Sequence, residues 1–134
     1  MQYWIMKSEP DVFSYDDLVQ KGQEHWDGVR NYTARNNMKA MKVGDKALFY
    51  HSNIDKAVVG IMKIVKTAYQ DPTSDDERWV CVDVAPFKKL KKSVSLAQIK
   101  ANPNLQEIKM IKQGRLSVID ITKEEFEEIL KMSQ

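Results

Sequence analysis

The chain contains little cysteine, histidine, glycine or proline. Its 134 residues include one cysteine, two histidines, five glycines and four prolines. The single cysteine, Cys81, excludes a disulfide within the chain and is typical of a reducing compartment. The histidines, His25 and His51, are not spaced as metal ligands with Cys81, so we expect no metal site. The few, scattered glycines form no phosphate-binding loop, which argues against nucleoside triphosphate hydrolysis.

A long hydrophobic run and a strong net charge are also missing. No apolar segment approaches the roughly 18 residues of a membrane span, and residues 1–6 are too short a segment for a signal peptide. The 21 basic and 19 acidic residues leave a net charge of +2, so binding to a polyanion would depend on a local patch. Size and composition predict one soluble domain, residues 1–134. We expect it to be cytoplasmic, or nuclear in a eukaryote.

Periodicity, capping residues and turns predict a mixture of short helices and strands. Three capping boxes predict helix starts, at Ser14 with Asp17, Ser95 with Gln98, and Thr122 with Glu125. Two more helices are expected over 33–41 and 105–113. Strands are expected over 3–7, 46–51, 58–67, 79–85 and 115–121. Five or six strands joined by short helices favour an α+β domain built on a small curled sheet or β-barrel.

The most unusual segment runs from Trp26 to Asn37 and contains two aromatic rings, two arginines and three asparagines. Burying so many polar groups without hydrogen-bond partners would be costly. Aromatic faces beside amides and guanidinium groups suit the stacking of a flat heterocycle and the reading of its edge. In a curled sheet, one pocket could gather Ser8, Trp26, Tyr32, Asn36 or Asn37, and His51 or Ser52. The alternative is that the aromatic residues belong to the core or its rim and the amides cap helices.

His51 and a lysine cluster each allow a functional and a structural interpretation. His51 could act as a general base, but the nearby sequence shows no carboxylate to orient it, which favours a structural histidine satisfied by a backbone carbonyl. Lys88, Lys89, Lys91 and Lys92 could contact phosphates near the pocket and make binding salt-dependent. The structural alternative is that these lysines form a solvated face.

Several long motifs resemble the EVE domain family and occur in the order typical of it. They are Tyr3–Pro10, Trp26–Asn37, Met41–Asp45, Phe49–Asn53, Asp71–Thr73, Arg78–Val80, Val94–Leu96 and Arg115–Val118. This resemblance covers nearly the whole chain. It implies a PUA-like fold, a compact β-barrel flanked by helices and related to YTH and ASCH domains. It also implies a reader of modified bases in DNA or RNA, which holds one extruded nucleotide in an aromatic-walled pocket and uses no cofactor.

The resemblance also implies roles for individual residues, carried over by motif position. Trp26 would be a stacking wall, with Tyr32 as a possible second surface. The polar readers would be Ser8, Asn31, Asn36 and Ser52, and the phosphate or edge contacts would be Lys7, Arg30 and Arg35. His51 completes the predicted ligand-binding set. One departure is that the family usually has a longer, aromatic-containing insertion where this chain has only Ser74–Glu77. The resemblance therefore does not supply one side wall of the pocket.

The sequence thus favours a non-enzymatic reader that flips one modified base into a pocket. Flipping costs a few kcal/mol, and stacking returns about 1–3 kcal/mol per base. We therefore expect modest affinity unless phosphate contacts or a partner add to it. The alternative is a hydrolase of a modified nucleoside, as among ASCH-type relatives, with Glu9 or His51 as the base. A third hypothesis is a small-molecule or protein-interaction module. The sequence identifies neither the modification nor the polymer.

Overall fold

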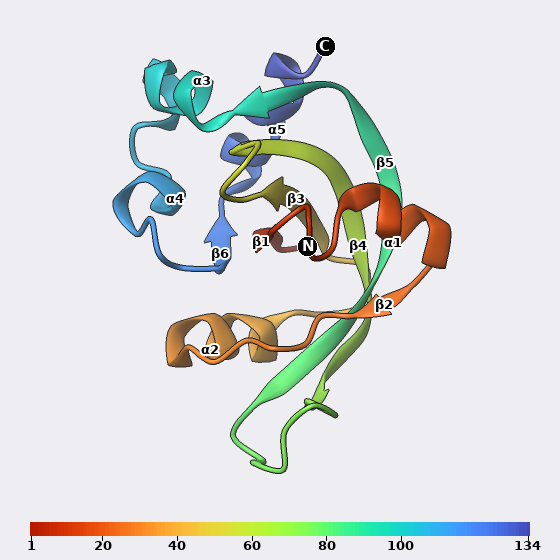
Figure 1. Cartoon of the computed structure of the whole chain (residues 1–134). Coiled ribbons are helices and arrows are strands. Elements are labelled where there is room, and N and C mark those ends of the chain that lie inside the picture. The colour runs from red at the N-terminus through yellow and green to blue at the C-terminus, as the bar shows by residue number, and fades with distance from the viewer.

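The computed structural model describes all residues from Met1 to Gln134 and is built around one six-stranded sheet (Figure 1). The strand order is β2-β5-β4-β3-β1-β6. The strands are β1 (Tyr3–Ser8), β2 (Glu24–His25), β3 (Lys46–His51), β4 (Ala57–Gln70), β5 (Val80–Ser95) and β6 (Val118–Ile121). Strands β1 and β3 pair in parallel, and all other pairs are antiparallel.

The sheet is bent but does not close. Register shifts interrupt the β4–β5 pairing at four places, and such bulges bend the strands that contain them. The outer strands β2 and β6 have two and four residues and do not pair with each other. The expectation of a β-barrel is therefore wrong in its closure, because these outer strands are too short to complete the hydrogen-bonded circle. The α+β class is confirmed.

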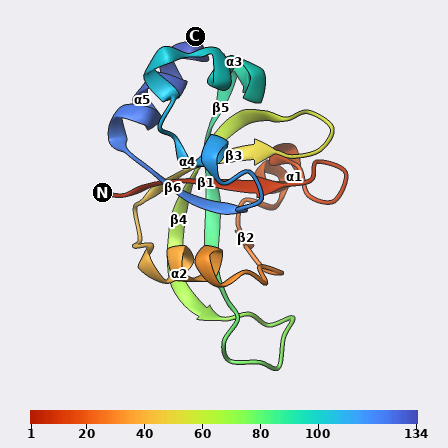
Figure 2. The same ribbon diagram turned by 90° about the vertical axis from the view of Figure 1, so that its left-hand side faces the viewer.

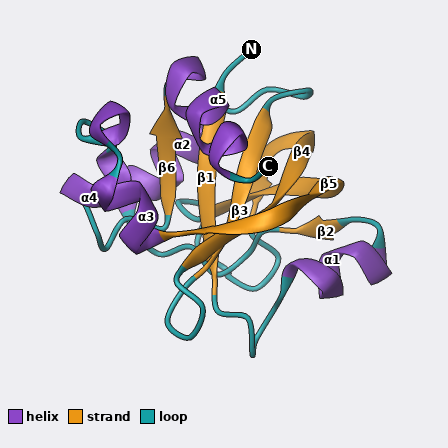
Figure 3. Ribbon diagram, turned by 90° about the horizontal axis from the view of Figure 1, so that it is seen from above, coloured by secondary structure: helices purple, strands orange, loops and turns teal.

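Short helices surround the sheet (Figure 3). They are α1 (Tyr15–Lys21), α2 (Tyr32–Ala40), α3 (Leu96–Ala101), a 3-10 turn η1 (Pro103–Leu105), α4 (Lys109–Lys112) and α5 (Lys123–Met132). Figures 1 and 2 show α3 and α5 near the C-terminus at one end of the sheet and α2 toward the opposite end. None of the helices has the length and the apolar character needed to cross a membrane.

The structure confirms the predicted helix starts, but one of the predicted helices does not form. All three predicted capping boxes are present, because the Ser14, Ser95 and Thr122 hydroxyls each accept from a backbone N–H three residues on. The predicted helix over 105–113 is wrong, since the chain forms η1 and then the four-residue α4. Its buried residues Leu105, Ile108 and Met110 would spread over more than half of the circumference of one regular helix, so that helix could not turn all three toward the core.

Strand β5 is longer than predicted and includes the lysine cluster. It continues ten residues beyond Ala85, with Lys88, Lys89, Lys91 and Lys92 exposed. Strand β2 pairs with β5 only at Asp83 and Val84, so the lysine-rich half has a strand partner on one side alone. Lysines on such an edge discourage pairing with another chain.

Candidate nucleic-acid interface

Trp26 lies directly after β2 and lines a cavity of about 220 Å³, called here the Trp26 cavity. Its backbone N–H donates to the Val82 carbonyl at 2.8 Å, which fixes the residue beside β5. The indole is 7% exposed and stands nearly perpendicular to Phe13 and Phe49, with centroids 6.5 and 5.3 Å away. The expected wall is therefore packed largely inward, and only a small part of the ring reaches the cavity.

The rest of the Trp26 cavity combines apolar and charged side chains. Its other lining residues are Lys7, Ser8, Val12, Phe13, Glu24, His25 and Asp27. Ser8 Oγ donates to the Phe13 carbonyl at 2.6 Å, and the Phe13 N–H donates to the Glu9 carbonyl at 2.9 Å. These bonds hold the turn after β1 against the indole. The predicted residues Lys7, Ser8 and Trp26 are therefore brought together, while Val12, Phe13 and Asp27 were missed.

Lys7 connects the Trp26 cavity with a larger one. Its Nζ donates to the Gly114 carbonyl at 2.9 Å and lies 5.7 Å from the centroid of the Tyr50 ring. Burial lowers the pKa of Lys7, and no carboxylate forms an ion pair with it. Lys7 and the predicted residue Ser52 both line a cavity of about 490 Å³. Lys7 thus borders two cavities at the end of β1.

Asn31 lies at a third cavity in the same region. Its side chain caps α2 by accepting from the Ala34 N–H at 3.0 Å. It also lines an open cavity of about 310 Å³, which shares Gly114 and Arg115 with the 490 Å³ cavity. Five of the predicted residues therefore line adjoining cavities: Lys7, Ser8, Trp26, Asn31 and Ser52.

Four other predicted residues gather elsewhere, outside these three cavities. Tyr32 packs on Trp79 with ring centroids 5.2 Å apart, and Arg78 donates to the Tyr32 hydroxyl at 3.1 Å. Guanidinium groups lie over both rings, Arg35 over Tyr32 at 5.0 Å and Arg30 over Trp79 at 5.8 Å. We call these five residues the aromatic–arginine cluster.

Asn36, the last of these four predicted residues, accepts hydrogen bonds from the Arg35 guanidinium at 2.8 and 3.2 Å. It is therefore engaged with the aromatic–arginine cluster through its carbonyl oxygen. Tyr32 is 52% exposed, so the cluster still offers a free aromatic surface. The single pocket expected from the sequence is replaced by two separate groups of residues.

Both ring nitrogens of His51 have partners within the protein. His51 is 9% exposed, and its Nε2 accepts from the Tyr15 backbone N–H at 3.1 Å. Its Nδ1 lies 2.8 Å from Asp55 Oδ2. Two expectations were wrong in detail. The backbone partner of His51 is an N–H group and not a carbonyl, and a carboxylate, Asp55, lies only four residues away in sequence. The turn Ser52–Asp55 returns the chain and brings Asp55 back to the ring. His51 lines none of the three cavities.

No group of three or more histidine, cysteine, aspartate or glutamate side chains is arranged to hold a metal ion. Cys81 is buried within β5, as its alternation with valines indicates. Burial raises the pKa of the Cys81 thiol. The side chains that line the three cavities can stack, donate and accept hydrogen bonds, and form ion pairs.

These features define a small α+β domain with a bent open sheet and a polar, partly aromatic surface at one end of β1. The chain belongs to the EVE domain family, whose model matches residues 2–132. It is 37% identical to thymocyte nuclear protein 1 of Mus musculus, over 98% of this chain and 74% of the mouse protein. The alignment spans 166 positions, so the mouse protein carries inserted residues that this chain of 134 lacks.

Solved structures show the same fold over the whole chain. A protein of Agrobacterium tumefaciens is 44% identical with a TM-score of 0.97, over 99% of this chain and 93% of that one. Human THYN1, in a complex with DNA containing 5-methylcytosine, is 36% identical with a TM-score of 0.93, over 100% of this chain and 98% of that one. An ASCH protein of Zymomonas mobilis, 12% identical with a TM-score of 0.62, shares the fold alone.

Proposed function

We propose that this protein is a DNA-binding reader that accepts one modified base, flipped out of its strand, in the Trp26 cavity. The observation that carries the proposal is the likeness to human THYN1 over the full chain, in a complex with DNA containing 5-methylcytosine. Residues 1–134 would act as one binding unit. The family resemblance also includes RNA readers, so the polymer is one of the variables of the test.

The Trp26 cavity offers a way to recognise a cytosine. Val12 and Phe13, with the exposed part of Trp26, provide apolar contact for the base and for a methyl group on it. Asp27 and Glu24 line the same cavity, and carboxylates accept hydrogen bonds from the exocyclic amine of cytosine. Glu24 already accepts from Lys21 Nζ and from the His25 N–H, so Asp27 is the carboxylate that a base with a carbonyl in place of that amine would leave without a donor. This favours cytosine over thymine.

Affinity would depend on phosphates as well as on the base. Stacking on the small exposed part of Trp26 should return less than the full value of about 1–3 kcal/mol, while flipping costs a few kcal/mol. We propose that Lys88, Lys89, Lys91 and Lys92 add phosphate contacts or long-range attraction along the edge of β5. Such contacts would make binding weaken steeply with salt.

The proposal is tested by fluorescence anisotropy with oligonucleotides that differ in one base. Single- and double-stranded DNA and RNA would carry 5-methylcytosine, 5-hydroxymethylcytosine or cytosine at one position. The wild type should bind at least one modified strand more tightly than the plain one. In Trp26→Ala this preference should disappear. Equal affinities of the wild type for all three bases in every strand would contradict the proposal.

A second variant is needed because Trp26 belongs to the core. Replacing such a ring with alanine costs about 3–5 kcal/mol of stability, so loss of binding could reflect loss of the fold. Asp27→Asn changes a side chain that is 41% exposed and should leave the melting temperature unchanged. It replaces one carboxylate oxygen of the Trp26 cavity with an amide group that donates, so the preference for 5-methylcytosine over thymine at the same position should fall while the protein stays folded.

The hydrolase alternative has one supporting observation. The Glu9 carboxylate lines the 490 Å³ cavity and forms no hydrogen bond or ion pair within the protein, whereas His51 is already engaged by Tyr15 and Asp55. Glu9 is therefore the better candidate base. Incubation with modified nucleosides followed by mass spectrometry tests this function. Turnover that is absent from Glu9→Gln would favour the hydrolase over the reader.

A further inference from the structure

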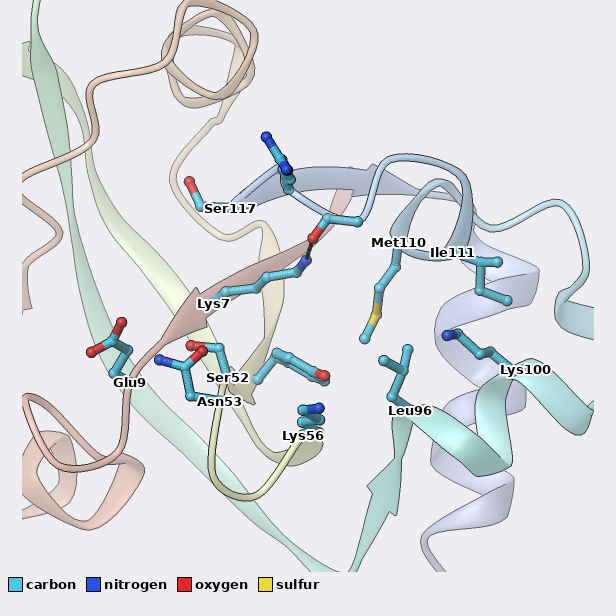
Figure 4. Close-up of a pocket in the computed structure, with 13 residues that line it drawn as sticks. Lys7, Glu9, Ser52, Asn53, Lys56, Leu96, Lys100, Met110, Ile111 and Ser117 are labelled. Carbon is cyan, nitrogen blue, oxygen red and sulfur yellow. Dashed lines mark hydrogen bonds between the residues drawn. The ribbon is translucent and has the colours of Figure 1, made fainter.

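The 490 Å³ cavity combines an apolar floor with a cationic rim. Figure 4 shows Lys7 extending from β1 into this 490 Å³ space, with Leu96 and Met110 across from it and Lys100 beyond them. The cationic lining residues are Lys7, Lys56, Lys100 and Arg115, against one carboxylate from Glu9. Because the whole chain carries a net charge of only +2, this is a local concentration of positive charge.

The cations of the rim are not neutralised within the protein. The side chains of Lys56, Lys100 and Arg115 form no ion pair, whereas exposed lysines elsewhere do, such as Lys89 with Asp16 and Lys109 with Asp120. Lys7 donates only to a backbone carbonyl, and burial lowers its pKa. An anion bound among these four groups would stabilise their charged forms.

The floor of the cavity suits a planar ring. Tyr50 and Met110 are 4% and 2% exposed, and Leu96 and Ile111 are partly buried beside them. Amides and hydroxyls from Asn53, Ser52 and Ser117 lie at the margin (Figure 4). An apolar floor under a cationic rim matches a nucleotide, because its base packs on apolar side chains and its phosphate pairs with cations.

Lys7 relates this cavity to the Trp26 cavity, because it lines both. We propose that the 490 Å³ cavity is a second nucleotide subsite, which takes the unstacked neighbour of the flipped base. The phosphate that links the two nucleotides lies at Lys7 Nζ, and the next phosphate lies among Lys56, Lys100 and Arg115. This inference rests on the proposed function, since it requires a base in the Trp26 cavity.

The second subsite should also discriminate between neighbouring bases. Glu9 is the only carboxylate of the cavity, and a carboxylate accepts from the amino group of cytosine or adenine. The subsite should therefore favour an amine-bearing neighbour over thymine. Unpairing of two adjacent bases is cheaper in a single strand than in a duplex, so single-stranded DNA is the appropriate probe.

The test compares two sets of charge variants on two kinds of oligonucleotide. The first variant, Lys56→Gln/Lys100→Gln/Arg115→Gln, removes three cations of the cavity. The second, Lys88→Gln/Lys91→Gln/Lys92→Gln, removes three cations from the edge of β5 and is the matched control. The probes are single-stranded DNAs with one 5-methylcytosine, in which the neighbouring nucleotides are either intact or abasic, titrated at several salt concentrations.

We expect the wild type to bind the intact strand at least tenfold more tightly than the strand with abasic neighbours. The cavity variant should lose most of that ratio, and its salt slope should decrease by about 0.7 for each phosphate contact removed. The edge variant should keep the ratio, whatever its salt slope. Both variants change exposed side chains, and equal melting temperatures would confirm that each is folded.

The outcomes separate this inference from the proposed function. The neighbour ratio is the affinity for the intact strand divided by that for the strand with abasic neighbours. If the wild type prefers 5-methylcytosine but the cavity variant keeps the full neighbour ratio, the second subsite is wrong and the proposed reader function stands. If the wild type binds modified and plain strands equally while the cavity variant still loses the neighbour ratio, the subsite stands and base reading is wrong. If no strand binds at all, both are overturned.

Discussion

Arg30 Nη1 lies 2.9 Å from Asp71 Oδ2, and this ion pair ties the segment after Trp26 to the start of the β4–β5 connection. The Asp71 side chain is fully buried. It also accepts from the Gly28 N–H at 2.8 Å and from the Thr73 N–H at 2.7 Å. One carboxylate therefore organises the turn that carries the chain from Trp26 to Tyr32.

Replacing Asp71 should destabilise the protein strongly. Asp71→Ala removes the carboxylate that accepts from Arg30, from the Gly28 N–H and from the Thr73 N–H, and a hydrogen bond to a charged group contributes about 1.5–3 kcal/mol. Urea denaturation should show this loss as a lower midpoint. The matched control is Asp76→Asn, which removes an exposed carboxylate paired with Arg78 and should change the midpoint little. Equal midpoints for both variants would show that the Asp71 network is not stabilising.

Asp71 should also make stability depend on acid pH. Burial by itself would raise the pKa of Asp71, but hydrogen bonds from Thr73, Arg30 and Gly28 lower it from 3.8 to about 2. A depressed pKa means that the ionised form stabilises the fold above pH 3.8, and that this contribution is lost as the pH falls toward 2. Asp71→Asn lacks the contribution, so its free energy of unfolding should fall less steeply than that of the wild type over this range. Parallel curves would contradict the assignment.

The sequence predicts the separate elements of the site better than their grouping. Capping boxes and strand patterns locate most elements, because these signals are local. Trp26 and Tyr32 are six residues apart and were expected around one pocket. Gly28, at φ 78°, and the Arg30–Asp71 pair turn the chain between them, so Tyr32 packs on Trp79 instead. Asp71, the partner of Arg30, lies more than forty residues away in sequence, and no local pattern reveals such a contact.

The inward packing of Trp26 was also hidden from the sequence. It depends on Phe13, which the Ser8 hydroxyl fixes by bonding to the Phe13 carbonyl. Strand β2 was missed because its two residues are too few to show an alternating pattern. By contrast, the carboxylate partner of His51 could have been found, since only five residues separate His51 from the next strand.

His51 should matter for stability and not for base recognition. His51→Ala leaves the buried Tyr15 N–H without an acceptor, and such a loss costs about 1–3 kcal/mol. Thermal unfolding should show the decrease. At a temperature where the variant is folded, its preference for a modified base should equal that of the wild type. If the fold is intact but the preference is lost, His51 has a direct role in the site.

The lysines on β5 should protect the protein from association. Lys88→Thr/Lys91→Thr/Lys92→Thr replaces charges on the lysine-rich half of β5, which has a strand partner on one side alone, with residues that favour strands. Light scattering should detect larger species for this variant at high protein concentration. Lys56→Thr/Lys100→Thr, which removes charge away from this edge, is the control and should stay at the size of the wild type. Equal scattering from the two variants would argue against edge protection.

Tyr32 should affect affinity without affecting the choice of base. It lies outside the Trp26 cavity, is 52% exposed and belongs to the aromatic–arginine cluster. Tyr32→Ala should therefore weaken binding of modified and plain oligonucleotides by the same factor, if a flanking base stacks there, or leave both unchanged. Anisotropy titrations with the two strands check this. A selective loss for the modified strand would place Tyr32 at the flipped base.

The most direct measurement follows the three tryptophan indole N–H signals by NMR during titration with single-stranded DNA containing one 5-methylcytosine. Trp4 serves as the internal control, because its Nε1 donates to Asp45 at 3.2 Å in the core, and Trp79 reports on the aromatic–arginine cluster. A base in the Trp26 cavity should shift the Trp26 signal by the largest amount and leave Trp4 in place, while cytosine at the same position should shift Trp26 less. Saturable binding with an unmoved Trp26 signal would contradict the account.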